Sequence, residues 1–458
     1  MAVSTTGTSD AALDAFHWSP QPHAAALVRE LVDDVLRRCP EAQALASRML
    51  DQTATRFIDW VDALVVPGSP ELGDRLRAAG FVLRRRRGAD TCFVHEAGIF
   101  PDIVMVPENR ARVTIAVDSV ADFCAVHALD AAQIEGVPHA PFRRVQVFCG
   151  DWAELWAVER HGYDGFQVAD LDPRYALDAA RVLESFRSRR RIFPGDEEGF
   201  DHAEDLVTKA VIAVGKDMAC DLFFAAEREY WQRRNRAARV QKERQDALGL
   251  GWANHDHHTY RSSRHAFKRL IAILESLGMV CRERFYPGGE AGWGAQVLEH
   301  PVTGVVVFAD VDMSAEELKS DFAHEGLPQR RTLGTVGLWC ALHGEAFLEA
   351  GMHHLECTFD FAALTAQLAP AGVAMMKPFT DFPHLHQAFT EGERWSVRRE
   401  RVMRLLAAEQ IEPHQARVFI DDGALGSHLE NLERNDGFKG FNQTGVDAII
   451  SATDPRKG

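Results

Sequence analysis

The sequence lacks the cysteine pattern of a secreted or zinc-binding protein. Its eight cysteines include no Cys-x-x-Cys pair, and they are too sparse for a disulfide framework in a chain of 458 residues. Structural disulfides are rare where thiols are kept reduced. We therefore expect free thiols and a cytoplasmic protein.

The sequence also lacks a basic surface and a long apolar run. The net charge is −16, whereas binding to nucleic-acid phosphates requires a basic face. No apolar run reaches the ~18 residues of a membrane helix, and residues 1–10 lack the charged and apolar regions of a signal peptide. We expect neither a nucleic acid nor a membrane as partner.

The composition is that of a globular protein, with 46% hydrophobic and 26% charged residues. Alternating strand and helix patterns over residues 56–167 and 255–420 flank a mostly helical segment at 175–247. We therefore predict an α+β fold with an N-terminal domain at 1–190, a helical linker at 191–250 and a C-terminal domain at 251–458. The charged run at 233–245 indicates a solvated helix within the linker. Residues 24–55 are predicted to be helical, and residues 57–61 and 416–420 to be strands.

A weak internal repeat relates the two halves. Arg-Val-Gln-Val-Phe at 144–148 precedes Glu-Arg-His-Gly-Tyr-Asp-Gly-Phe at 159–166. Arg-Val-Phe-Ile at 417–420 precedes Glu-Arg-Asn-Asp-Gly-Phe-Lys-Gly-Phe at 433–441 in the same order. This pattern predicts a duplicated chain. Trp156 then takes the place of Glu430, so we expect no metal site in the first copy.

Three segments of the second half contain candidate metal ligands. They are Asp-His-His-Thr-Tyr-Arg at 256–261, Gly-Met-His-His-Leu at 351–355 and Glu-Asn-Leu-Glu-Arg at 430–434. Two histidines and one carboxylate form the facial triad of non-haem iron(II) oxygenases, which leaves positions open for substrate and oxygen. Because the chain has 20 histidines, a structural role for any one of them is the competing interpretation.

Spacing and strand parity leave several choices of ligand open. The first ligand is His257, with His255 and His258 as alternatives. The second is a choice between the neighbours at 353 and 354, and the third between the glutamates at 430 and 433. Arg261 shares a strand face with His257, roughly 13 Å along the strand, and its guanidinium is a candidate for binding a substrate carboxylate. Gln296 is a further candidate for a substrate hydrogen bond.

The second half resembles the vicinal-oxygen-chelate dioxygenases, in particular the 4-hydroxyphenylpyruvate dioxygenase and 2-oxoadipate dioxygenase/decarboxylase groups. Residues 256–257 resemble the Asp-His that opens their catalytic half, 351–355 their Gly-Val-Gln-His-Leu/Ile, and 430–434 their Glu-Ile-Ile-Gln-Arg. The glycine-rich segment 437–442 resembles the turn before their C-terminal helix, here residues 446–452. The resemblance selects His257, His354 and Glu430 as the ligands of Fe(II).

The resemblance also implies a fold and a reaction. The fold would be tandem βαβββ modules that form two incomplete barrels, and the reaction oxidative decarboxylation and hydroxylation of a 2-oxo acid with O2. Arg261 resembles the arginine that holds the distal substrate carboxylate in the 2-oxoadipate group. Phe438 and Phe441 are expected to wall the pocket, with core packing as the alternative.

Other functions remain open at this level. An extradiol-type or other metal-dependent enzyme of the same superfamily needs the same ligands, and a non-catalytic binding protein needs only the paired modules. A homodimer is an open alternative to a monomer. The choice between an aromatic and a dicarboxylic aliphatic 2-oxo acid is not made by the sequence.

Overall fold

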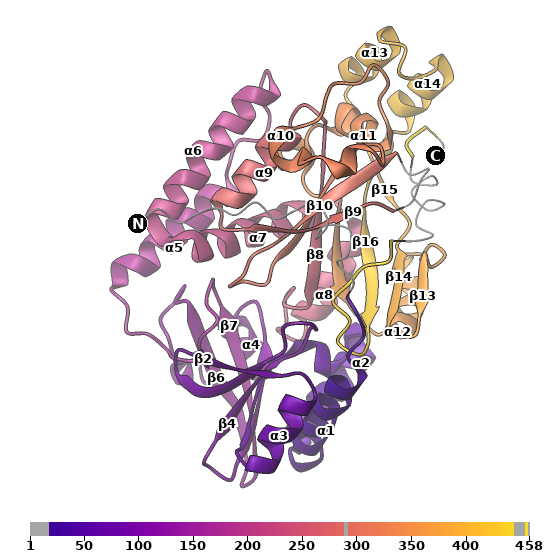
Figure 1. The fold of residues 1–458 in the computed structure, drawn as a ribbon. Coiled ribbons are helices and arrows are strands. Elements are labelled where there is room, and N and C mark those ends of the chain that lie inside the picture. Colours follow the sequence, from indigo (N-terminus) through magenta and orange to yellow (C-terminus); the bar gives the residue numbers. More distant parts are fainter. Residues whose placement is uncertain (1–17, 288–291, 444–453, 457–458) are drawn as a thin grey trace.

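The computed structural model describes residues 18–287, 292–443 and 454–456. Within them the chain forms two mixed β-sheets, one of seven strands in the N-terminal half and one of nine strands in the C-terminal half. Figure 1 shows the first sheet with its helices at one end of the molecule and the second sheet at the other. The predicted helix at 446–452 lies outside the described residues.

The first sheet has the strand order β2-β3-β4-β1-β5-β7-β6. β1 is parallel to β4 and antiparallel to β5, and β5 is parallel to β7. The elements of this half are α1 (Pro22–Arg38), α2 (Pro40–Thr53), η2 (Phe57–Trp60), β1 (Val61–Pro67), α3 (Pro70–Ala78), β2 (Val82–Arg86), β3 (Ala89–Val94), β4 (Asp102–Val106), β5 (Ala111–Ala116), α4 (Val120–His127), η3 (Ala131–Gln133), β6 (Phe142–Cys149) and β7 (Ala153–Arg160).

The second sheet has the order β13-β14-β16-β12-β8-β11-β10-β9, with β15 beside β16. Its elements are β8 (His255–Ser262), α9 (Phe267–Ser276), β9 (Val280–Phe285), β10 (Trp293–Glu299), β11 (Val306–Asp312), η4 (Glu317–Lys319), α10 (Phe322–Glu325), α11 (Thr335–His343), η5 (Ala346–Ala350), β12 (His354–Thr358), α12 (Phe361–Leu368), η6 (Ala369–Ala371), β13 (Thr380–Phe382), β14 (Leu385–Phe389), β15 (Glu393–Trp395), α13 (Arg399–Ala407), α14 (Pro413–Asp421) and β16 (Ala424–Arg434).

The two sheets repeat one topology. In the second sheet β8 is parallel to β11 and antiparallel to β12, and β12 is parallel to β16. In the first sheet β1 is likewise parallel to β4 and antiparallel to β5, and β5 is parallel to β7. Each set β1-α3-β2-β3-β4, β8-α9-β9-β10-β11 and β12-α12-β13-β14-β16 is a βαβββ module, and β5-α4-β6-β7 has one strand fewer. The predicted α+β fold of tandem βαβββ modules is thereby confirmed.

Four helices join the two sheets in sequence: α5 (Pro173–Arg187), α6 (Asp196–Val214), α7 (Lys216–Arg233) and α8 (Arg236–Asp246). They share one hydrophobic core with the second sheet, which includes both Phe223 of α7 and Val297 of β10. The expectation of a solvated helix at 233–245 is wrong for one face of α8. Gln241 and Gln245 are fully buried there and bond to the Thr53 carbonyl and to Asn254.

Three predicted elements differ from the structure. The helix at 24–55 is interrupted at Cys39, whose extended backbone is what the residue before Pro40 favours. Residues 57–60 form a 3₁₀ turn, closed by the ion pair of Arg56 and Asp59, and β1 begins at Val61.

Residues 416–420, predicted to be a strand, belong to helix α14. Pro413 occupies its first turn, and Glu412 and Gln415 form a reciprocal capping box that sequence periodicity alone did not reveal. The first segment of the proposed repeat therefore fails, because its counterpart at 144–148 lies in strand β6. Among the described residues, no helix is long and apolar enough to cross a membrane.

Candidate metal centre

Three neighbouring strands bring His257, His354 and Glu430 together. Strand β12 lies between β8 and β16, and the three side chains come one from each strand. One potential ligand atom from each residue lies within 4.8 Å of the others, and all three side chains are buried. His354 Nε2 is 3.2 Å from Glu430 Oε2. The three residues selected by the resemblance thus form a buried group that could hold a metal ion.

Strand register arranges the polar side chains in two rows. His257 is paired with Glu356, and Glu356 with Glu430. One step further along the same face, Thr259 is paired with His354, and His354 with His428. Thr259 Oγ1 lies 2.8 Å from His354 Nε2. We call the row of His257, Glu356 and Glu430 the lower row and that of Thr259, His354 and His428 the upper row. The lower row therefore contributes both carboxylates, and the upper row contributes the second imidazole of the triad.

Sequence reasoning missed Glu356. It lies two residues after His354 on the same strand, so alternation already placed both side chains on one face. Its Oε2 is 3.2 Å from His257 Nε2, and its side chain is fully buried. A search for every carboxylate with the parity of a candidate ligand would have found it.

The triad lies at a cavity of about 70 Å³ inside the second barrel, which is room for several water-sized molecules. Its lining is His257, Thr259, Arg261, Phe285, Trp293, Phe308, Asp310, His353, His354, Glu356, Phe379, Gln387, Phe389, His428, Glu430, Phe441 and Asn442. Much of the wall is aromatic, and most of the polar lining groups come from strands β8, β12 and β16. This combination is typical of a small-molecule site.

The predicted substrate-binding residues divide into two groups. Arg261 and Phe441 line the cavity. Arg261 is buried, and its Nε and Nη1 have no hydrogen-bond partner among the described residues. Phe441 packs edge-on against His257, with ring centroids 5.2 Å apart. Both are therefore placed to contact a ligand.

Gln296 and Phe438 do not line the cavity. Gln296 Nε2 instead donates to the Glu283 carbonyl, because alternation along β10 turns Trp293 toward the cavity and residue 296 away from it. Phe438 packs in a separate apolar cluster with Leu385 and Leu432. The alternative of core packing therefore describes Phe438.

The surroundings of the triad shift the pKa values of its three members in different directions. Burial lowers the pKa of His257, but Glu356 and Asp256 outweigh burial and raise that pKa to about 9. Burial, together with the neighbouring His428, lowers the pKa of His354 well below its usual value. Burial and the adjacent Glu356 raise the pKa of Glu430 well above its usual range. A bound cation would relieve the repulsion between the carboxylates of Glu356 and Glu430.

His257 is oriented from behind by an ion pair. Its Nδ1 lies 3.2 Å from Asp256 Oδ1, and Asp256 is held by Arg434. Donation from Nδ1 leaves Nε2 facing the cavity as the atom able to bind a metal. A carboxylate behind a histidine is the usual arrangement around metal-binding imidazoles.

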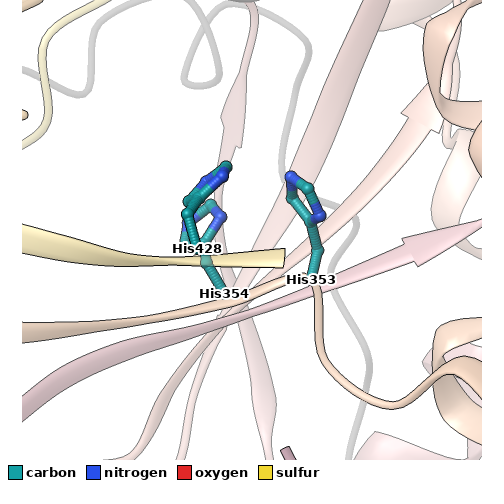
Figure 2. A group of neighbouring side chains, drawn as sticks. All are labelled: His353, His354 and His428. Atoms are coloured by element: carbon teal, nitrogen blue, oxygen red, sulfur yellow. The ribbon is translucent and has the colours of Figure 1, made fainter. Parts of the chain in front are cut away.

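A second group of potential ligands overlaps the first. His353, His354 and His428 also offer ligand atoms within 4.8 Å of one another. Figure 2 shows the rings of His354 and His428 side by side, with the ring of His353 across from them. His353 Nδ1 donates to the Gly426 carbonyl, whereas His354 Nδ1 and His428 Nε2 have no partner among the described residues. Since both groups use His354, a metal in one competes with a metal in the other for this imidazole.

The first sheet has no equivalent set of ligands in the corresponding register. There Ala63, Thr114 and Trp156 take the positions of His257, Glu356 and Glu430. Arg112 and Glu154, which take the positions of His354 and His428, form an ion pair of 2.9 Å. The Arg112 guanidinium also lies 5.0 Å above the Trp156 ring. The correspondence of Trp156 with Glu430, predicted from the repeat, is the one that the register gives.

No family model matches the sequence, and no curated protein is detectably similar to it. The similar solved structures include a mutant of 4-hydroxymandelate synthase from Streptomyces coelicolor, 14% identical over 88% of this chain and 98% of that chain, with a TM-score of 0.29. They also include a xylose isomerase-like TIM barrel/4-hydroxyphenylpyruvate dioxygenase fusion protein, 12% identical over 88% of this chain and 53% of that chain, at 0.27.

Methylmalonyl-CoA epimerase from Mycobacterium tuberculosis is a third similar structure. It is 12% identical over 40% of this chain and 88% of that chain, with a TM-score of 0.23. At these identities and TM-scores the likenesses carry no functional inference. The fold described above rests on the strand order and register of this chain, and the candidate site on its own side chains.

Proposed function

We propose that this protein is an iron(II)-dependent dioxygenase that decarboxylates and hydroxylates a 2-oxo acid with O2. The observation that carries the proposal is the meeting of His257, His354 and Glu430 in one buried cavity. The ordered motifs around these residues, which resemble those of vicinal-oxygen-chelate dioxygenases, support the same reaction.

The donor set fits iron(II). Two imidazole nitrogens and one carboxylate oxygen are the ligands of the facial triad, and this set leaves positions for a bidentate substrate and for oxygen. Iron(II) supplies the electrons that activate O2 when it is bound. The two carboxylates of the lower row, Glu356 and Glu430, form ion pairs only with histidines among the described residues, which also fits a cation between them.

The remaining side chains of the cavity bind and shield the substrate. Arg261 lines the cavity, and its Nε and Nη1 have no hydrogen-bond partner among the described residues, so it would hold a carboxylate of the substrate through charge-assisted hydrogen bonds. Phe308 and Phe441, whose rings pack edge-on 4.6 Å apart, exclude water from the side of His257. In the balanced reaction the 2-oxo acid loses CO2, and the two atoms of O2 enter the new carboxylate and the new hydroxyl group.

Glu356 favours a second candidate function. A buried carboxylate beside a metal-binding histidine can act as a general base, which suits a metal-dependent isomerase built on the same modules. Such an enzyme needs no O2. Turnover under nitrogen would therefore separate it from the oxygenase.

The test is oxygen consumption by the purified protein loaded with iron(II), measured with a panel of aromatic and dicarboxylic 2-oxo acids. We expect consumption of O2 with stoichiometric release of CO2 for one class of acid. His354→Ala should abolish both, whereas Glu325→Gln, on the exposed end of α10, should change neither. Iron binding that survives His354→Ala unchanged, or the absence of any O2 uptake across the panel, would contradict the proposal.

A further inference from the structure

Glu356 is a second buried carboxylate in the candidate metal centre. Its side chain is fully buried, and its Oε2 lies 3.2 Å from His257 Nε2. Its other oxygen, Oε1, has no hydrogen-bond partner within the described part of the chain. A buried carboxylate oxygen without a partner is costly unless something else satisfies it.

The two carboxyl groups of this centre are adjacent. Glu356 and Glu430 are paired in register across β12 and β16. One amide serves both, since Gln387 Nε2 is 3.2 Å from Glu430 Oε1 and 3.5 Å from Glu356 Oε2. A single side-chain donor cannot satisfy the acceptor sites of two carboxylates.

The buried carboxyl groups around the cavity differ in the partners that the described residues give them. Asp256 is neutralised by Arg434, to which it is bonded. Asp310 lies in register with Arg261 on the neighbouring strand, without an ion pair between them among the described residues, and burial raises its pKa to about 7. For Glu356 and Glu430, the described residues provide ion pairs with His257 and His354 alone. When both carboxyl groups are ionised, their two negative charges match the charge of one divalent cation.

We infer that Glu356 is a fourth protein ligand of the metal held by His257, His354 and Glu430. The inference rests on the metal centre of the proposed function, and it changes the centre from one carboxylate to two. With two carboxylates and two neutral imidazoles, a divalent ion would give a site without net charge. An octahedral ion would keep about two open positions instead of the three of a facial triad. A bidentate 2-oxo acid would fill both, so the entry of O2 would require Glu356 to leave.

Manganese(II) is a suitable probe because it prefers oxygen-rich octahedral sites and because its effect on water proton relaxation reports the water molecules bound to it. The full-length protein is freed of metal with a chelator and titrated with manganese(II), as are the variants Glu356→Gln, Glu356→Ala and His354→Ala. Asp310→Asn is the matched control, because Asp310 lines the same cavity but forms no ion pair with either histidine among the described residues.

We expect Glu356→Gln to weaken manganese(II) binding at least tenfold and Asp310→Asn to leave it unchanged. Glu356→Ala should add one bound water to about two in the native protein. If Glu356→Ala does not fold, the affinity of Glu356→Gln decides. An unchanged affinity in Glu356→Gln, with binding lost in His354→Ala, would overturn the role of Glu356 and leave the proposed function standing. Unchanged binding in His354→Ala would overturn both.

Discussion

Arg434 grips Asp256 through two hydrogen bonds, of 2.7 Å from Nε and 3.0 Å from Nη2. The N-terminal half contains the same arrangement, in which Arg160 donates to Asp62 at 2.5 and 2.9 Å. Each arginine also donates from Nη1 to carbonyls of the glycine-containing segment that follows its strand. We refer to the pairs as the two braces. The N-terminal brace fixes β7 to β1, and the C-terminal brace fixes β16 to β8.

The two braces allow a matched pair of variants. Arg160→Met and Arg434→Met should each destabilise the fold by about 3–5 kcal/mol, because each leaves an aspartate whose side chain is only 12% (Asp62) or 9% (Asp256) exposed without its arginine partner. Only Arg434→Met should also weaken iron(II) binding, by about 10–100-fold, because Asp256 orients a metal-binding histidine whereas Asp62 stands beside Ala63. Urea unfolding and metal titration measure the two effects. Equal metal affinity in both variants would mean that the C-terminal brace is only architectural.

Arg261 should determine how tightly the substrate binds. Arg261→Met removes the guanidinium but keeps much of the apolar stem, so we expect the KM of the preferred 2-oxo acid to rise at least tenfold while iron(II) affinity is kept. Arg261→Lys should recover part of the loss, since lysine keeps the charge but not the planar fork. Arg284→Met is the control, because Arg284 donates to the Leu318 carbonyl and does not line the cavity. Steady-state kinetics at saturating O2 would test this, and a KM that does not move would contradict the role of Arg261.

The duplication could be predicted from sequence because the braces leave a local signature. Glu159-Arg160 and Glu433-Arg434 each end a strand, and a glycine and a phenylalanine follow at similar spacing. The arginine needs nearby carbonyls to bond and an aromatic ring to cover it, so the whole segment is constrained together. That constraint is why the Trp156 correspondence held although the other half of the repeat failed.

The triad could be selected from ordered motifs, but its surroundings could not. Gln296 was an attractive candidate by type, yet the parity of β10 turns it away from the cavity, and parity relative to a cavity requires knowing which face the barrel encloses. Glu356 shares a strand face with His354, but the facial triad contains only one carboxylate ligand, so the pattern does not point to a second one. Residues 416–420 were apolar enough for a strand, and only the caps of α14 make them helical.

Glu345 predicts how stability depends on pH. Burial raises the pKa of this carboxyl to about 7, although it accepts hydrogen bonds from Ser262 Oγ and the Ser263 amide. Between the usual pKa of a glutamate, near 4.5, and pH 7, the folded protein holds a proton that the unfolded chain has released. This contribution to the free energy of unfolding is therefore full below that window and is lost as the pH rises through it.

Glu345→Gln should remove this contribution to the pH dependence. We expect the free energy of unfolding of the native protein, measured with urea, to fall between pH 5 and pH 8 by on the order of a few kcal/mol more than that of the variant. Glu325→Gln, exposed on α10, should keep the native pH dependence. A Glu345→Gln variant whose stability falls with pH as steeply as that of the native protein would contradict the assignment.

The choice between the two overlapping sets of ligands can be made with two variants. Glu430→Gln removes a ligand from the set with His257, and His428→Ala removes one from the set with His353. If the carboxylate-containing set holds the metal, Glu430→Gln should weaken cobalt(II) binding by at least 100-fold, whereas His428→Ala should change it by less than about threefold. The reason is electrostatic, since the three-histidine set is uncharged and lies near the Arg261 guanidinium. Burial and, next to it, the Arg261 charge lower the pKa of His353 and His428, and the same charge repels a metal cation. Cobalt(II) titration followed by visible absorption measures both variants, and the reverse order of effects would place the metal on the three histidines.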